Sequence, residues 1–290
     1  MNDLSSISTK RKFKSGLLNF FIYLCVAFLL ALLAFLIGCI FVKGLPNVTW
    51  ELLTTEQSFL KGTNGILPNI LNTLYIIIIT LIIVLPLGTG AAIYLNEYAK
   101  SKRAVKIIEY AVETLAGIPS IIYGLVGMLV FCEALKLQTS ILSGSLTLVI
   151  MTLPVVIRTT CESLKTVPNS YREGSLALGS GKWHMVRTVV LPSAIDGIVT
   201  GCILSIGRIV GESAALLFTA GMANETLSII DAVTPGNAGS TLTVAMYMYA
   251  KERGDMDTAF AIAAILLIIT FIINIAAHLA AKLLKKETRK

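Results

Sequence analysis

The chain has 290 residues, of which 55% are hydrophobic and only 14% charged, with a formal net charge of +7 and a mean hydropathy of +0.80. Long apolar runs with so few charges exclude a soluble globular domain and indicate a polytopic membrane protein. The basic residues are divided among four segments, which argues against a nucleic-acid-binding patch. The five scattered cysteines show no metal-ligand spacing, and their odd number argues against a disulfide framework.

The apolar segments set the expected architecture. A helix needs roughly 20 apolar residues to cross a bilayer. The chain offers six such stretches, at residues 16–42, 67–95, 108–132, 141–161, 193–220 and 258–283. We therefore predict an all-α, polytopic membrane protein with six transmembrane helices, in which Pro119 bends the third.

The distribution of basic residues predicts the orientation. Lysines and arginines gather in both tails and in the second and fourth connections, whereas the remaining connections have few or have more acidic residues. By the positive-inside rule, both termini and these connections face the cytoplasm, where they contact anionic lipid of the bilayer. We divide the chain into an N-terminal tail, a first helix with its external loop, a core domain and a C-terminal tail, at residues 1–15, 16–66, 67–283 and 284–290.

The fourth connection, residues 162–192, is the most informative segment. Ser170 and Glu173, three residues apart, predict a capping box at the start of a short helix, and Gly179 is placed to end that helix in the left-handed conformation. A helix of about eight residues is marginal alone in water, so it needs a surface to pack on. Residues 182–190 are expected to form a second short helix, which ends before Pro192.

This connection also contains a family motif. It reads Glu173-Gly174-Ser175-Leu176-Ala177-Leu178-Gly179 and, nine residues after the last glycine, Val189-Val190-Leu191-Pro192. The spacing resembles E-A-A-x-x-x-G-x9-I-x-L-P, the cytoplasmic docking loop of ABC importer permeases. The resemblance implies that a separate ATPase is contacted by Glu173, Gly174, Ser175, Gly179, Leu191 and Pro192.

The resemblance extends over about residues 65–283, and its further segments are Leu115–Leu125, Leu153–Thr160 and Arg208–Ala220. The chain resembles the PstA-type permease subunit of phosphate ABC transporters, a type I importer fold. This family implies a heterodimer with a sister phosphate permease, two copies of an ATP-binding subunit and an extracytoplasmic phosphate-binding protein in a prokaryotic cell membrane. It implies no cofactor. Cys161, Ser213 and Ala215 depart from the residues expected for this subunit type, which are glutamate, threonine and proline.

Two charged residues in the fifth span are candidates for the substrate pathway. Charges in a membrane helix are costly and are candidates for function by default. Arg208 and Glu212 are four residues apart, which would place them on one helix face and pair them. The alternative is an internal ion pair that only lowers the cost of insertion.

No nucleophile–base pair, metal cluster or complete phosphate-binding loop is found in the sequence, so the chain is expected to be a non-catalytic translocase subunit. Three other functions stay open. One is a permease for another oxyanion or small solute. Another is a secondary transporter driven by an ion gradient, which would favour an internal repeat with broken helices. The third is a membrane scaffold, which would not need the two charges in the fifth span.

Overall fold

The computed structural model of the chain describes residues 9–58 and 63–288, and the side chains of 14–57, 65–279 and 282. Within this part the regular structure is helical apart from an antiparallel pairing of Gln57–Ser58 with Thr63–Asn64, which confirms the all-α class. The helices are α1 (Thr9–Gly44), α2 (Trp50–Thr54), α3 (Leu67–Ile93), α4 (Lys102–Ala116), α5 (Ser120–Gly127), α6 (Ile141–Thr166), α7 (Asn169–Ala177), α8 (Lys182–Met185), α9 (Leu191–Gly211), α10 (Ala214–Thr219), α11 (Ile229–Val233), α12 (Leu242–Tyr247) and α13 (Met256–Thr288). The strands are β1 (Gln57–Ser58) and β2 (Thr63–Asn64), and a 3-10 turn, Leu45–Asn47, follows α1.

Short π-helical turns extend several of these helices. They are η2 (Tyr94–Tyr98) after α3, η3 (Met128–Ala134) after α5, η4 (Val186–Val190) between α8 and α9, and η5 (Met248–Glu252) after α12.

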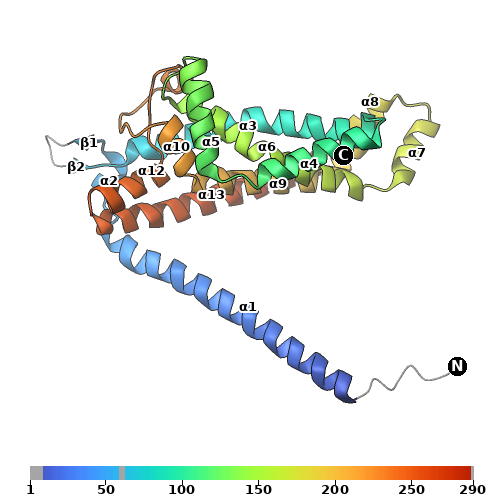
Figure 1. Ribbon diagram of the computed structural model, residues 1–290, viewed down its shortest axis with the longest axis horizontal. Coiled ribbons are helices and arrows are strands. Elements are labelled where there is room, and N and C mark those ends of the chain that lie inside the picture. The colour runs from blue at the N-terminus through green and yellow to red at the C-terminus, as the bar shows by residue number, and fades with distance from the viewer. Residues whose placement is uncertain (1–8, 59–62, 289–290) are drawn as a thin grey trace.

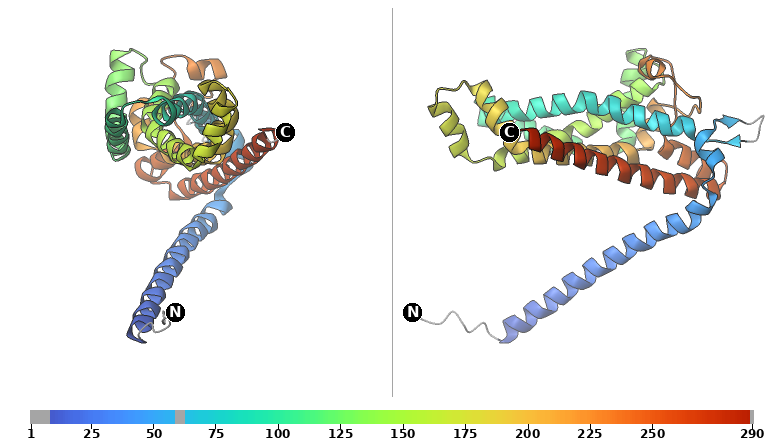
Figure 2. Two further views of the ribbon diagram at one scale, coloured as in Figure 1. Left: turned by 90° about the vertical axis from the view of Figure 1, so that its right-hand side faces the viewer. Right: turned by 180° about the vertical axis from the view of Figure 1, so that it is seen from behind.

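Helices α3, α6, α9 and α13 pack together as the body of the molecule (Figure 1). The α7 and α8 helices lie at one end, and α2, α12 and the strands lie at the other. Close approach relies on small residues: a Cβ added to Gly88 of α3 would meet Val156 of α6 at 2.6 Å. Helix α1 begins, and α13 ends, at the α7 end (Figures 1 and 2).

Helix α1 extends away from this body and meets it only near its last residues (Figure 2). At Gly44 there is no room for a side chain against Phe260 and Ala264 of α13. Apolar side chains of α1 are exposed along most of its length, and this helix is apolar all round. Such a surface requires lipid or another apolar helix around it.

The third span is broken where the sequence predicts a bend. Helix α4 and the continuous pair α5–η3 meet at 98° across Gly117-Ile118-Pro119. A single helix over 108–132 is therefore wrong in shape, although the predicted role of Pro119 is confirmed. Within the described residues, five helices are long and apolar enough to cross a membrane, or six when this bent pair counts as one span.

The fifth span differs from its prediction at both ends. One helix runs from Lys182 through η4 to Gly211, so Pro192 does not end a separate short helix. It lies at the junction of the π turn η4 and α9, where the Leu191 amide donates to the Val186 carbonyl and the helix continues past the proline. At its other end the helix stops at Gly211, and the chain resumes as α10 only at Ala214.

The loops at the α12 end are tied to the bundle by buried polar groups. The side-chain amide of Asn69, in the first turn of α3, donates to Asn224 Oδ1 at 2.8 Å and to the Ser240 carbonyl at 3.2 Å. A short helix continues from α12 through η5 and ends before Gly254, which adopts φ +68°.

Candidate functional site

The predicted docking segment, α7 to η4, projects from one end of the bundle (Figure 1). Helix α6 ends at Thr166, and α7 begins at Asn169 directly after Pro168. Ser170 is therefore the second residue of α7, and no side chain caps this helix, so the predicted capping box with Glu173 is wrong. The extended conformation of Pro168 starts the helix two residues earlier than a cap at Ser170 would.

The end of α7 is ordered by its own backbone and by two hydroxyls. The amide of Ser180 donates to the Ser175 carbonyl and that of Gly179 to the Leu176 carbonyl, which is a Schellman motif. Gly179 adopts φ +83°, as predicted. The Ser175 and Ser180 hydroxyls lie 2.7 Å apart. Ser175 thus has a structural role in closing the turn.

The tip of the docking segment exposes apolar side chains. Leu178 is 90% exposed and Trp183 is 59% exposed, and Tyr171 and Leu176 are also largely open to solvent. Between α7 and η4 lies an open groove lined by Gly174, Gly179 and His184 among others. Large exposed apolar side chains beside a groove on a polar loop mark a binding surface.

The structure gathers some of the predicted docking residues and separates others. Glu173, Gly174 and Gly179 are exposed on α7 and the turn after it. Leu191 and Pro192 lie in the first turn of α9, where Leu191 packs on an apolar core. They support the segment and are not part of its exposed tip.

Arg172, which the sequence analysis counts only as a basic residue, is the best-connected side chain of α7. Its guanidinium donates to Glu97 of η2 at 2.9 and 3.0 Å, and to the carbonyls of Leu164 and Val167. Those carbonyls lie at the end of α6, where C=O groups lack the regular α-helical partner four residues on. The sequence gives little sign of this ion pair because its two residues are 75 positions apart.

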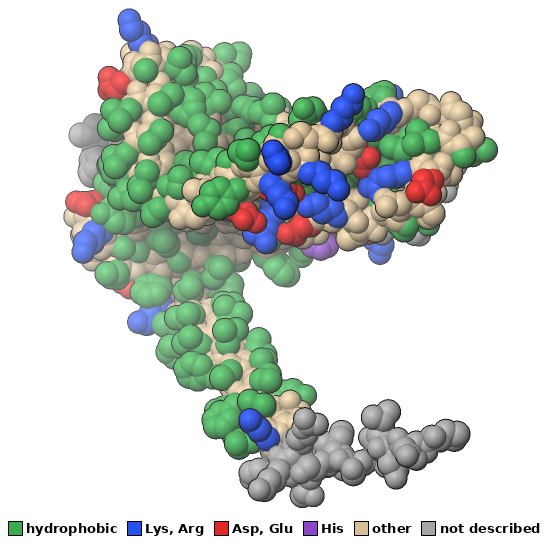
Figure 3. Space-filling model, turned by 45° about the vertical axis from the view of Figure 1, so that its right-hand side comes forward, with side chains coloured by type: hydrophobic (Ala, Val, Ile, Leu, Met, Phe, Trp, Pro, Cys, Tyr) green, Lys and Arg blue, Asp and Glu red, His purple; other side chains and the backbone are tan. Residues whose placement is uncertain are grey.

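On the face shown in Figure 3, basic side chains gather toward this end of the molecule, whereas much of the other visible surface is hydrophobic. The exposed basic residues here include Lys100, Lys102, Arg103, Lys106, Lys182 and Arg187. Their position beside an apolar body is the pattern expected at the cytoplasmic membrane surface.

The second candidate region is formed by the two broken spans. Helices α5 and α10 pack so closely that a Cβ added to Gly124 would lie 2.8 Å from the Cα of Ala215. The hydroxyl of the buried Tyr123 donates a hydrogen bond of 2.7 Å to the carbonyl of Leu115, across the α4–α5 break. Irregular backbone within a membrane protein is tolerated where other protein groups satisfy it, as here.

Arg208 and Glu212 lie at this region but do not form the predicted pair. Arg208 is half-buried in the last turn of α9. Glu212 lies beyond the helix end, with ψ +125°, so the two residues do not share a helix face. The ion pairs of the described side chains include Arg158–Glu162, Lys165–Glu109 and Arg172–Glu97.

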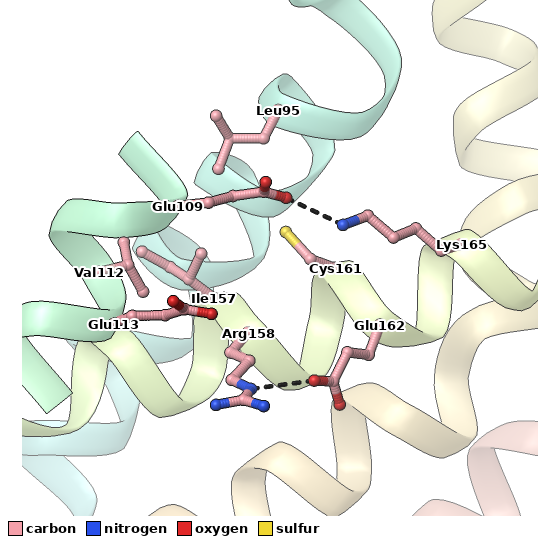
Figure 4. Close-up of a pocket in the computed structure, with 9 residues that line it drawn as sticks. All are labelled: Leu95, Glu109, Val112, Glu113, Ile157, Arg158, Cys161, Glu162 and Lys165. Carbon is pink, nitrogen blue, oxygen red and sulfur yellow. Dashed lines mark hydrogen bonds and ion pairs between the residues drawn. The ribbon is translucent and has the colours of Figure 1, made fainter. Parts of the chain in front are cut away.

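A charged pocket lies between α4 and α6 (Figure 4). Lys165 reaches Glu109 across the two helices at 2.9 Å, and Arg158 pairs with Glu162 one turn along α6 at the same distance. Both pairs are largely exposed, and Cys161 is buried behind them. Within the described residues, no cluster of three or more His, Cys, Asp or Glu side chains is arranged to hold a metal ion.

Comparison with solved structures supports the fold. The chain is similar to the crystal structure of a bacterial ABC transporter involved in the import of the acidic polysaccharide alginate, with a TM-score of 0.65 and 14% identity over 93% of this chain and 96% of that one. An inward-facing structure of the MetNI methionine ABC transporter gives a TM-score of 0.58 at 18% identity, over 76% of this chain and 94% of that one. The fold is therefore that of a type I ABC importer permease.

Comparison with known sequences identifies the family. The chain is 35% identical to the probable ABC transporter permease protein YqgI of Bacillus subtilis, over 91% of this chain and 94% of that protein. It is 31% identical to the phosphate transport system permease protein PstA of Pasteurella multocida, over 93% and 95% respectively. The family model for binding-protein-dependent transport system inner membrane components matches residues 84–290. This chain, a multi-pass membrane protein, belongs to that family of ABC transporter permeases.

Proposed function

We propose that the chain is the permease subunit of an ATP-driven phosphate importer, which forms half of the translocation pathway and docks an ATPase through residues 162–192. The observation that carries this proposal is the exposed apolar tip of the docking segment, with Leu178 at 90% exposure. The substrate is inferred from relatives named as phosphate permeases, such as the one from Pasteurella multocida.

The docking segment suits a cleft on a soluble ATPase. Leu178 and Trp183 are available to enter an apolar cleft, and Gly174 leaves open space for close approach of a partner's backbone. The basic residues beside the segment support a position at the cytoplasmic surface, where ATP is available. The chain itself hydrolyses no ATP in this proposal, because that reaction belongs to the partner.

Arg208 supports a pathway for an anion. Phosphate carries one to two negative charges and cannot cross hydrocarbon unaided, so its path must offer positive charge without trapping it. A guanidinium provides a fork of donors that fits phosphate oxygens. Arg208 is half-buried at the end of α9, beside a break in the fifth span. It takes part in none of the ion pairs given above for the described residues.

A sister permease completes the pathway. One chain presents its two broken spans on one side of a bundle and leaves α1 standing away from it (Figure 2). We infer that the sister subunit covers these surfaces. Both chain ends then lie in the cytoplasm with α7, and the α12 end faces an external phosphate-binding protein.

Reconstitution tests the proposal. The chain is co-expressed with the sister permease and ATPase from its own organism, purified through a tag on this chain, and placed in liposomes with the binding protein. We expect the ATPase to co-purify and labelled phosphate uptake to require ATP. Liposomes with a proton gradient and no ATP serve as the control.

Each alternative function predicts a different outcome. Uptake of sulfate or molybdate in preference to phosphate would assign the chain to another oxyanion. Uptake driven by the proton gradient alone would identify a secondary transporter. ATPase binding without uptake of any solute would favour a scaffold.

A further inference from the structure

The docking segment is fixed to the end of α3 as well as to the two helices that it connects. The Arg172 side chain bridges α7 to Glu97 of η2 through two of its nitrogens. Only 17% of the Arg172 side chain and 5% of the Glu97 side chain are exposed. Both nitrogens donate to the same oxygen, Glu97 Oε1, and two charge-assisted hydrogen bonds to one buried carboxylate restrict the orientation of the guanidinium as well as its distance.

A second contact joins the other arm of the segment to the same turn. The ammonium of Lys182, at the start of α8, lies 5.1 Å from the centre of the Tyr98 ring. This is a cation–π distance. The two arms of the docking segment, α7 and α8, thus hold adjacent residues of η2 from both sides of Gly179.

An apolar core lies beneath these two contacts. Met185 and Val186 are almost completely buried, together with Ala92 and Ile93 of α3 and Leu164 of α6. Close-packed side chains of this kind transmit displacement, since moving one helix alone would open a void. The Ser163 hydroxyl also donates to the Ala194 carbonyl of α9 at 2.8 Å.

The start of the bent span has a weaker connection. Helix α4 contributes only partly buried side chains to this core, Val105 and Val112, and it meets α6 through the Lys165–Glu109 pair, whose side chains are 58% and 38% exposed (Figure 4). Exposed pairs contribute little to holding two helices in one geometry. The cytoplasmic ends of α3, α6 and α9 are therefore held together more firmly than α4 is held to them.

We propose that Arg172 and Lys182 are positioning residues, which clamp the docking segment to η2 so that α3 moves with α6 and α9 as one rigid unit. This inference rests on the proposed docking of an ATPase. When nucleotide binding to the ATPase moves α7, the helices α3, α6 and α9 then move together. The bent span that begins with α4 shifts relative to these three helices.

The test measures phosphate transported per ATP hydrolysed in the reconstituted complex of this chain, its sister permease, the ATPase and the binding protein. Glu97→Gln keeps the shape of the side chain but removes its charge. We expect the ratio to fall roughly tenfold, the scale on which residues along a coupling path act. The amount of ATPase that co-purifies should stay unchanged, because Glu97 lies away from the exposed tip.

Matched variants separate coupling from folding. Glu109→Gln removes the comparable but exposed pair with Lys165 and should leave the ratio unchanged. Tyr98→Phe keeps the ring over Lys182 and should also leave it unchanged, whereas Tyr98→Leu should lower it. In a cysteine-free background, a short bis-maleimide joining Glu97→Cys to Arg172→Cys should restore the ratio, which a merely structural defect would not allow.

The test distinguishes a failure of the proposed function from a failure of the clamp. A wild-type preparation that contains no ATPase would contradict the proposed function and this inference together. A bound ATPase with an unchanged transport ratio in Glu97→Gln would contradict the clamp alone. Equal losses of membrane abundance, ATP hydrolysis and uptake, without rescue by the cross-link, would also overturn it in favour of a folding role.

Discussion

The carboxylate of Glu212 accepts a hydrogen bond of 3.0 Å from the backbone amide of Ala215, in the first turn of α10. Thr243 of α12 donates to the carbonyl of the same glutamate at 2.8 Å. The side chain and the backbone of Glu212 thus satisfy groups that the break between α9 and α10 would otherwise expose. Glu212 holds a broken helix together, whereas the sequence predicted that it would pair with Arg208.

This geometry predicts how Glu212 variants behave. Glu212→Gln keeps an oxygen that accepts from Ala215, so membrane abundance and thermal stability should stay close to wild type. Glu212→Leu leaves that amide unpaired, at a cost of about 1–3 kcal/mol, and should lower the melting temperature of the detergent-purified protein. Recovery of stability and uptake in the double variant Arg208→Gln/Glu212→Gln, beyond either single variant, would restore the ion-pair hypothesis.

Arg208 should be required for uptake and not for folding. Arg208→Gln removes charged hydrogen bonds, each about 1.5–3 kcal/mol, and should reduce labelled phosphate uptake by about tenfold or more at normal membrane abundance. Arg208→Lys keeps the charge without the planar fork, so its phosphate uptake should lie between that of the wild type and that of Arg208→Gln. Wild-type uptake by Arg208→Gln would remove this residue from the pathway.

The contact between the broken spans can be tested with a pair of glycines. Gly124→Ala places a Cβ against Ala215 and Phe218, whereas Gly90→Ala on α3 meets nothing within 4 Å. Both changes improve helix propensity by about 1 kcal/mol, so their difference reports packing. We expect Gly124→Ala to be less stable than Gly90→Ala by about 1–3 kcal/mol. Equal thermal stability of the two variants would show that α5 and α10 separate freely.

The sequence predicted features that depend on local residues. The apolar stretches located the spans, Pro119 located the bend, and Gly179 located the left-handed turn, because each depends on a residue's own properties. The break after Gly211 was missed because the surrounding apolar residues continue through it, and the groups that stabilise it come from elsewhere. Its partner Thr243 is 31 residues away from Glu212.

The same reason explains the omission of Arg172. Nothing near it in the chain distinguishes it from the other basic residues of a cytoplasmic loop. Its partner Glu97 belongs to the end of another span, and only the packing of α3 against α6 brings the two together. The capping box failed differently, since Pro168 starts α7 before Ser170 can act as its cap.

Cysteine labelling tests the proposed orientation. The background replaces the five native cysteines, and the probes are Lys100→Cys at the α7 end and Thr226→Cys at the other end, both at exposed positions. An impermeant maleimide should label Thr226→Cys in intact cells and Lys100→Cys only after permeabilisation. The reverse pattern would place both termini outside.

Gly179 offers the sharpest test of the docking turn, because its requirement is conformational. Its φ of +83° is disfavoured for a residue with a Cβ, although nothing lies within 4 Å of that position. Gly179→Ala should therefore cost about 1–2 kcal/mol in the turn and move α7 relative to α8, with less co-purified ATPase and slower uptake. Gly179→Asn tolerates the left-handed region better and should be milder.

The matched control is Gly181→Ala, two residues along the same turn. Gly181 has φ −70° and equally open surroundings, so alanine there adds the same methyl group without strain. We expect this variant to bind ATPase and transport phosphate as the wild type does. Equal losses in both variants would mean that the added methyl groups block the partner directly. Normal binding and uptake by Gly179→Ala would show that the ATPase does not depend on the shape of this turn.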